Sequence, residues 1–237
     1  MTTAAVITIG NELLSGDVVD TNAVWLARRL ERDGVHVQLM ETLPDDIERI
    51  ASVVARTAAE HDLVLVTGGL GGTPDDLTRE AIAAAFAVEQ QEVPELASAL
   101  RNRFPHDPDY AVAWAQLPVG SRPLENPLGG APGFLLENVY VLPGLPAEME
   151  AMFETFEDEL RAGPPIASWR RVYRTRESEI ARVLAEATDR YAAVRIGSYP
   201  TFAAAGPEVE VVLKCADSDT LQVAVAWLEQ ELGRVTS

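Results

Sequence analysis

The chain has 237 residues, of which 47% are apolar and 24% charged, which suits one large domain or a medium domain followed by a small one. Because no apolar run approaches the ~18 residues of a membrane span and the start lacks the features of a signal peptide, we expect neither a membrane nor a secreted protein, and place the chain in the cytoplasm. With 37 acidic against 19 basic residues there is no basic stripe for a phosphate backbone, which excludes nucleic acid as a main partner.

Three strands are predicted in the first third of the chain. Residues 4–9 and 63–67 are continuous apolar runs, the pattern of parallel strands that are buried on both faces of a sheet. Residues 35–39 alternate between apolar and polar and predict another strand between them.

Two amphipathic helices separate these strands. Asp20 or Thr21 caps the first helix, which ends at Gly34, and Pro44 and Asp45 begin the second. The resulting βαβαβ order predicts an α/β domain with a parallel sheet.

Less regular structure is expected after residue 67. Two helices follow a glycine-rich segment, an irregular connection comes next, and two short strands form a hairpin before a last helix. The helices end near residue 87 and cover residues 94–104, the connection covers 106–133, the strands 134–136 and 139–142, and the last helix begins at Pro146.

A second unit follows a linker at residues 163–165. The pattern beyond the linker reads β, α, β, β, α, which predicts a small α+β unit with an antiparallel sheet covered by two helices. We therefore expect one domain over residues 1–163 and a subdomain over residues 166–237. Cys215 lies in a predicted strand of this unit and is expected to be a buried apolar residue without chemistry of its own.

The glycine-rich segment is the strongest functional signal. Gly68, Gly69, Gly71 and Gly72 lie between a buried strand and a helix whose predicted cap is Thr73, with Pro74 first in the helix and Asp76 at the capping-box position. Exposed amide groups before a helix favour an anion such as phosphate. A tight turn with a good cap is the alternative.

Two acidic residues modify this interpretation. Asp75 and Asp76 would repel a phosphate unless a divalent cation such as magnesium or manganese lies between them. The alternative is that they only complement the helix dipole. The three histidines share no ligand spacing, so a histidine zinc site is not expected.

Other polar residues meet this segment at the carboxyl edge of the predicted sheet. Glu12, Asp20 and Asn22 follow the first strand and Asp45 follows the second, and ligands bind at that edge of a parallel sheet. Each of them alone has the alternative role of a cap or a solvated loop residue. The turn around Gly144 either offers amide groups to a ligand or only ends a strand.

Four ordered motifs resemble the CinA-type proteins within the MoaB/Mog fold. They cover about residues 4–160, and their order along the chain makes a chance agreement improbable. The motifs are Ile9–Leu14 with Gly16 and residues 20–22, then residues 68–78 from Gly68 to Thr78, residues 126–133, and residues 142–149.

The resemblance implies a three-layer αβα sandwich with a mostly parallel sheet. For CinA-type domains it implies hydrolysis of ADP-ribose to AMP and ribose 5-phosphate, a reaction that depends on Mg, Mn or Co and is stimulated by K⁺. Related domains hydrolyse FAD. MoaB/Mog relatives bind molybdopterin and adenylylate it. By motif, Asp45 and Asp76 resemble metal or catalytic acids and Gly68 to Thr73 the phosphate loop. Relatives commonly form dimers or trimers, so a homo-oligomer is expected.

Two departures from the family pattern stand out. Gly72 occupies a position that is usually proline, which predicts a looser loop. Full-length CinA proteins carry a further domain that deamidates nicotinamide mononucleotide, and because this sequence ends at Ser237 without it, we do not expect that activity.

Three functions remain open at this point. The first is a pyrophosphatase in which Asp45, Asp75 and Asp76 hold metal, with Glu12 or Asp20 as base or orienting residue. The second is a molybdopterin-binding or transferring protein, and the third a module that senses a nucleotide without turnover.

The charge pattern also predicts that the protein comes from a salt-rich environment. The net charge is −18 and Lys214 is the single lysine, while the acids are dispersed along the chain, which suits a surface kept soluble in concentrated salt. We therefore expect a halophilic protein; ordinary acidity is the alternative.

Overall fold

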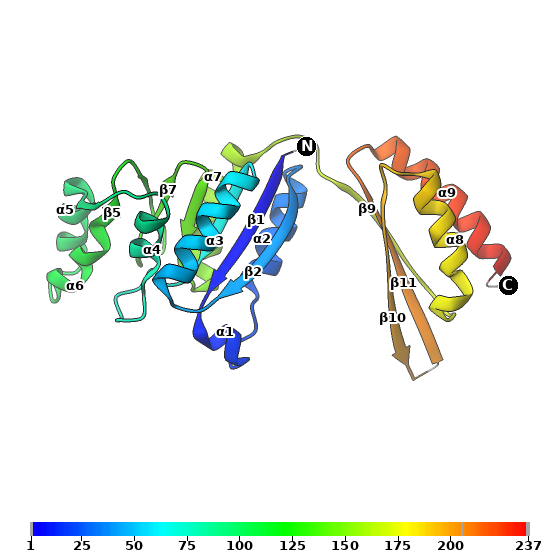
Figure 1. Cartoon of the computed structure of the whole chain (residues 1–237), viewed down its shortest axis with the longest axis horizontal. Coiled ribbons are helices and arrows are strands. Elements are labelled where there is room, and N and C mark those ends of the chain that lie inside the picture. The colour runs from blue at the N-terminus through cyan, green and yellow to red at the C-terminus, as the bar shows by residue number, and fades with distance from the viewer. Residues whose placement is uncertain (1, 205, 236–237) are drawn as a thin grey trace. The chain divides into compact units, whose positions relative to one another are not determined.

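The computed structural model describes residues 2–204 and 206–235. The chain forms two compact units, Met1–Gly163 and Pro164–Ser237, which are described separately (Figure 1). Within the described residues, no helix has both the length and the apolar character needed to cross a membrane.

The first unit is built on a six-stranded mixed sheet in the order β2-β1-β3-β8-β7-β6. The four strands β2, β1, β3 and β8 are parallel, β7 runs antiparallel to them, and β6 pairs antiparallel with β7. The strands are β1 (Thr3–Ile9), β2 (His36–Leu43), β3 (Leu63–Thr67), β8 (Val139–Leu142), β7 (Gly133–Leu136) and β6 (Arg122–Leu124). The three predicted N-terminal strands and the 134–142 hairpin are thus confirmed.

Helices pack on both faces of this sheet because successive side chains of β1 point to opposite sides. Ala4 and Val6 join a core with helices α2 (Asn22–Arg32) and α7 (Pro146–Leu160). Ala5 and Ile7 join the other core, with α3 (Ile47–Glu60), α4 (Thr78–Ala85) and α5 (Pro94–Arg103). The predicted three-layer αβα sandwich is confirmed (Figure 1).

Two predicted helix starts are wrong, and one short helix was not predicted. The second helix begins at Ile47 instead of Pro44, with Asp46 as its cap accepting from the amide of Arg49. Residues 11–15 form a short helix, α1 (Asn11–Ser15), at the end of β1. Helix α4 begins only at Thr78, because the preceding residues form a hydrogen-bonded loop of their own.

The predicted irregular connection at 106–133 is more ordered than expected. It contains α6 (Pro108–Val112), a 3₁₀ helix η1 (Ala113–Ala115), β5 (Gln116–Pro118) and β6. Strand β5 pairs antiparallel with β4 (Gln90–Glu92). Such three-residue strands carry too few residues to show a periodicity in the sequence.

The second unit has the predicted α+β pattern. Its antiparallel sheet has the order β10-β11-β9, and two helices pack on it through a separate apolar core. Its elements are β9 (Ala167–Tyr173), α8 (Glu177–Arg190), β10 (Arg195–Ala203), β11 (Gly206–Cys215) and α9 (Ser218–Val235). Cys215 is buried in this core, as expected.

Candidate functional site

A cleft of about 510 Å³ opens at the carboxyl ends of the parallel strands. It lies where the strand order reverses between β1 and β3, the position at which open α/β sheets bind ligands. The residues that follow these strands, Gly10, Gly68 and Pro143, form its floor, and Asp45 contributes from beyond β2.

Close backbone packing explains the first two glycines of the loop between β3 and α4. A Cβ at Gly68 would lie 2.2 Å from the carbonyl oxygen of Ile9, and one at Gly69 would lie 2.3 Å from the hydroxyl of Thr78. Both residues have positive φ, 109° and 65°, a region that side chains disfavour. These glycines bring the loop down against β1 and the start of α4.

Asp76 organises the rest of the loop. One carboxylate oxygen accepts from the amide of Gly71 at 2.8 Å, and the other accepts from the amide of Thr73 at 2.8 Å and from its hydroxyl. The predicted helix cap at Thr73 is therefore wrong: Asp76 closes a turn on Thr73 before the helix begins.

Two residues at the start of α4 hold the carbonyl groups of the loop. The hydroxyl of Thr78, fully buried, donates to the carbonyl of Gly68 at 2.8 Å. The guanidinium of Arg79, only 5% exposed, donates to the carbonyls of Leu70 and Gly71 at 2.9–3.1 Å. Burial lowers the pKa of Arg79, against the opposing effect of Glu80 and Asp76. Because this buried cation donates its hydrogen bonds to backbone carbonyls, it holds the loop in place.

Two residues of this loop bring free amide groups to the cleft. Within residues 2–204 and 206–235, the amides of Gly69 and Leu70 donate no hydrogen bond to the chain, and both residues line the cleft. The amide of Gly72 also has no acceptor in this part of the chain, but Gly72 does not line the cleft. Successive free amides next to glycines are the groups with which proteins bind phosphate oxygens.

Three carboxylates crowd one side of the cleft. Glu12 on α1, Asp45 and Asp75 all line it, and an oxygen of Asp45 accepts from the amide of Asn11 at 2.9 Å. Burial raises the pKa of Asp45, and the negative charges of Glu12 and Asp75 raise it further, against the amide of Asn11. A cation bound among these acids would relieve their repulsion.

These acids fit a metal that the ligand helps to coordinate. In the part of the chain that the structure describes, no three His, Cys, Asp or Glu side chains lie close enough to form a complete metal site. Magnesium and similar ions are commonly bound by one or two carboxylates together with phosphate oxygens and water. Asp45 and Asp75 can supply such carboxylates, whereas Asp76 already uses both oxygens on the loop.

A smaller cavity of about 90 Å³ adjoins the cleft and shares Glu12, Gly68 and Gly144 with it. The amide nitrogen of Asn22 donates to the hydroxyl of Thr67 and the carbonyl of Gly144, and its buried oxygen has no partner among the described residues. Asp20 also lines this cavity and accepts from the amide of Ala23. It therefore caps α2.

The structure thus divides the predicted site residues into three groups. Glu12, Asp45, Asp75, Asp76 and four glycines line the cleft, while Asp20 and Asn22 line the smaller cavity. The four glycines are Gly68, Gly69, Gly71 and Gly144. Gly72, Thr73 and Thr78 belong to the frame of the loop instead of the cleft wall.

Gly72 lies beside the ring of Tyr110, since a Cβ at Gly72 would lie 2.4 Å from that ring. The looser loop expected from this glycine stays a prediction.

Sequence reasoning missed three residues of the site. Trp114 lines the cleft, is 8% exposed, and its indole nitrogen has no hydrogen-bond partner in the described part of the chain. Glu148 lines the cleft and accepts from the side chain of Asn126. Arg79 carried a usable signal, because it is a cation on the inward face of a predicted helix next to the glycines.

Each of the two units matches a known family. Residues 5–162 match the family described as "Probable molybdopterin binding domain", and residues 170–236 match "FAD synthase, middle domain". A CinA-like protein of Frankia casuarinae is 39% identical in an alignment that covers 95% of this chain and 57% of that protein. One of Citrifermentans bemidjiense is 40% identical, with 96% and 58% covered. The chain thus spans a little more than half the length of these relatives.

A solved structure shares both fold and sequence with the first unit. The crystal structure of a CinA protein from Thermoplasma acidophilum is 32% identical, with a TM-score of 0.64, over 67% of this chain and 98% of that one. The chain therefore belongs to the CinA-like proteins, with a domain of the molybdopterin-binding family followed by one that resembles the middle domain of FAD synthase.

Proposed function

We propose that the cleft hydrolyses the pyrophosphate bond of a dinucleotide or nucleotide sugar such as FAD or ADP-ribose with the help of a divalent metal. The observation that carries this proposal is the joint presence of three carboxylates, Glu12, Asp45 and Asp75, and the free loop amides of Gly69 and Leu70 in the lining of one cleft. The amides suit phosphate oxygens, and the carboxylates suit a cation that balances the phosphate charge.

Each group has a distinct task in this proposal. The amides of Gly69 and Leu70 bind phosphate oxygens, and Asp45 and Asp75 would hold Mg²⁺, Mn²⁺ or Co²⁺. When bound, the metal supplies positive charge that stabilises the negative charge developing on the phosphate oxygens. Asp76 keeps the loop in the shape that presents the amides.

Hydrolysis then needs a water molecule and a base. The water oxygen bonds to one phosphorus, the bond from that phosphorus to the bridging oxygen breaks, and Glu12 accepts the proton of the water. ADP-ribose would give AMP and ribose 5-phosphate. Glu12 suits this role because it lies on the wall shared by the cleft and the smaller cavity, within reach of water from either side.

The apolar part of the cleft lining suits the ring system of the ligand. Trp114, Leu145 and Ala131 belong to this lining. Small-molecule sites are typically apolar surfaces with a few polar groups that fix orientation.

Product analysis tests this proposal. The purified chain is incubated in concentrated KCl with MgCl₂, MnCl₂ or CoCl₂ and either ADP-ribose or FAD, and nucleotides are separated by chromatography. We expect AMP release that requires the divalent metal. If neither substrate yields AMP with any of the three metals, the proposed hydrolysis is wrong.

Molybdopterin is the second candidate ligand, and the family match of residues 5–162 favours it. This alternative uses the same loop for the pterin phosphate. It predicts pterin fluorescence that co-purifies with the chain and an adenylylated product when ATP is added. Fluorescence and adenylylation without AMP release from ADP-ribose or FAD would favour it over hydrolysis.

A further inference from the structure

The ring of Tyr110 lies against the backbone of Gly72. An ideal Cβ at Gly72 would lie 2.4 Å from Cε2, 2.5 Å from Cζ and 2.7 Å from the hydroxyl oxygen of this ring. Such distances are far shorter than van der Waals contact. The tyrosine ring therefore occupies the space that any side chain at position 72 would need.

Tyr110 is 45% exposed and packs on one aromatic ring, that of Trp114. The two ring centroids lie 5.4 Å apart, and the ring of Trp114 lies 5.5 Å from that of Phe104, with these two rings nearly perpendicular. Phe104 packs against the main apolar core, which includes Trp114. Edge-to-face pairs of this kind are favourable beyond their buried area. Contacts among these three aromatic rings therefore connect the apolar core to the loop.

Gly72 is the midpoint of the turn that Asp76 closes. The residues on either side, Gly71 and Thr73, donate their amides to the two oxygens of the Asp76 carboxylate. The free amide of Gly72 lies between them. The packing contact between the ring and Gly72 therefore constrains the segment of the loop that would bind phosphate.

We propose that Tyr110 is a positioning residue, which holds the loop Gly68–Asp76 in its ligand-binding shape by packing on Gly72. The role of that loop in binding phosphate rests on the proposed function, but the contact and its effect on the loop do not. Gly72 and Tyr110 form a matched pair: the glycine leaves room and the ring fills it.

The backbone of Gly72 sharpens this inference. Gly72 is not among the residues of positive φ, so its conformation is open to alanine, and the ring of Tyr110 supplies the contacts that exclude a Cβ. Removal of the ring should therefore make position 72 tolerant of alanine.

Amide hydrogen exchange tests the proposal without any ligand. In Tyr110→Ala we expect the protection of the Gly71 and Thr73 amides to fall about tenfold or more, because their bonds to Asp76 open more often. The amides of Val6 and Ile7 in β1 report global stability and should keep their protection. Tyr110→Phe should restore the loop, and Tyr199→Ala, which removes an exposed ring in the second unit, should change nothing there. Unchanged loop protection in Tyr110→Ala overturns the proposal.

A double-mutant comparison gives an independent readout. Gly72→Ala alone should lower loop protection, whereas in the Tyr110→Ala background it should have little further effect, a non-additivity expected of residues in contact. Gly163→Ala is the matched control, since nothing lies within 4 Å of a Cβ there. Additive effects of the two substitutions would contradict the matched pair.

The kinetic consequence separates this proposal from the proposed function. If ADP-ribose or FAD is hydrolysed, Tyr110→Ala should raise KM about tenfold with a smaller change in kcat, because the free loop must be ordered on binding. If no hydrolysis is found, the proposed function fails, and the exchange data still decide whether Tyr110 positions the loop.

Discussion

Two neighbouring aspartates of the loop have different environments. Asp76 accepts three hydrogen bonds from Gly71 and Thr73 with its two oxygens, whereas Asp75 is exposed and lines the cleft near Asp45. Asp76 therefore shapes the loop. Asp75 faces solvent at the cleft, where a hydrogen bond from the Thr73 side chain lowers its pKa and favours the charged carboxylate that a cation would need.

This difference predicts that two conservative substitutions affect different properties, stability in one case and metal binding in the other. Asp76→Asn should lower the free energy of unfolding by about 1–3 kcal/mol, because one amide donor of the loop loses its acceptor. Asp75→Asn should change stability by less than about 0.5 kcal/mol, as surface substitutions usually do, while it weakens metal binding. Urea unfolding measures the first effect and Mn²⁺ titration the second. Equal loss of stability in both variants would contradict these roles.

The sequence predicted which residue types gather at the site but not which role each has. Glycines before a helix and acids after strands were enough to locate the cleft. The partner of Asp76 could not be predicted, because it depends on a loop that turns back on itself before α4 begins. Trp114, which lines the cleft, and Tyr110, which lies beside Gly72, were missed because they come from a segment without periodicity.

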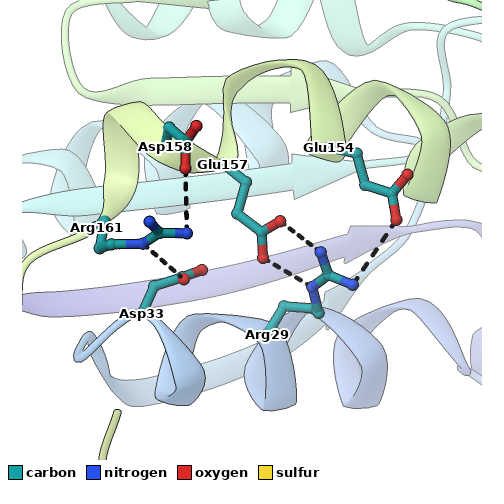
Figure 2. Close-up of polar contacts among 6 residues, drawn as sticks. All are labelled: Arg29, Asp33, Glu154, Glu157, Asp158 and Arg161. Atoms are coloured by element: carbon teal, nitrogen blue, oxygen red, sulfur yellow. Dashed lines mark hydrogen bonds and ion pairs between the residues drawn. The ribbon is translucent and has the colours of Figure 1, made fainter. Parts of the chain in front are cut away.

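At the scale of elements, an ion-pair network joins α2 to α7 (Figure 2). The guanidinium of Arg29 binds Glu157 through two nitrogens and lies 3.7 Å from Glu154. At the other end of the network, Arg161 lies 3.8 Å from Asp33 and 3.1 Å from Asp158. The network covers the edge of one of the two cores of the sandwich.

Asp33 is the strained member of this network. It is 4% exposed and ends α2, where a negative charge opposes the helix dipole. Burial raises its pKa, and the charge of Glu157 raises it further, although Arg161 acts in the opposite direction. The pKa of Glu157 is lowered, chiefly by its hydrogen bond to Arg29. The ionised form of Asp33 therefore lowers the free energy of unfolding.

We predict that Asp33→Asn stabilises the protein at neutral pH. Since the folded-state pKa of Asp33 is raised, the wild type gains stability as the pH falls through that pKa toward the unfolded value. The advantage of the variant should therefore be full above the folded pKa and shrink as the pH is lowered. Urea unfolding between pH 4 and 8, as an approximate range, measures this difference.

Asp158→Asn is the control for this prediction. Its side chain is 90% exposed and pairs with the same arginine, so this substitution should change the free energy of unfolding by less than about 1 kcal/mol. A constant or growing advantage of Asp33→Asn toward low pH would contradict the cost assigned to Asp33.

The predicted elements agree with the structure where tertiary packing is regular. Strands buried on both faces and helices with a clear apolar stripe were found within a few residues. The start of α4 was misplaced because Thr73, Pro74 and Asp76 form a good local capping pattern, yet Arg79 and Thr78 hold the loop in another shape. Contacts between distant residues outweighed local propensity there.

At the scale of the whole molecule, charge is the dominant property. A net charge of −18 destabilises a compact state through self-repulsion. The Debye length falls from about 10 Å at 0.1 M salt to about 3 Å at 1 M, so added salt removes most of this repulsion. We propose on this basis that the chain is adapted to concentrated salt.

Salt dependence of unfolding tests this proposal. Calorimetric melting in 0.1 to 2 M KCl, an approximate range spanning weak and strong screening, should show the transition temperature rising with salt. NaCl should act similarly, since screening does not distinguish the two cations. A transition temperature that stays constant or falls with salt would contradict adaptation to salt.

The central claim is that one cleft joins a phosphate loop to a metal held by Asp45 and Asp75. The most direct test is the Mn²⁺ dependence of AMP release from ADP-ribose by the wild type, Asp45→Asn and Glu95→Gln, the last an exposed acid in the first turn of α5. We expect wild-type and Glu95→Gln rates to rise equally with Mn²⁺, and the Asp45→Asn rate to be lower by about 100-fold or more. Equal rates in all three proteins, or release without metal, would contradict the account.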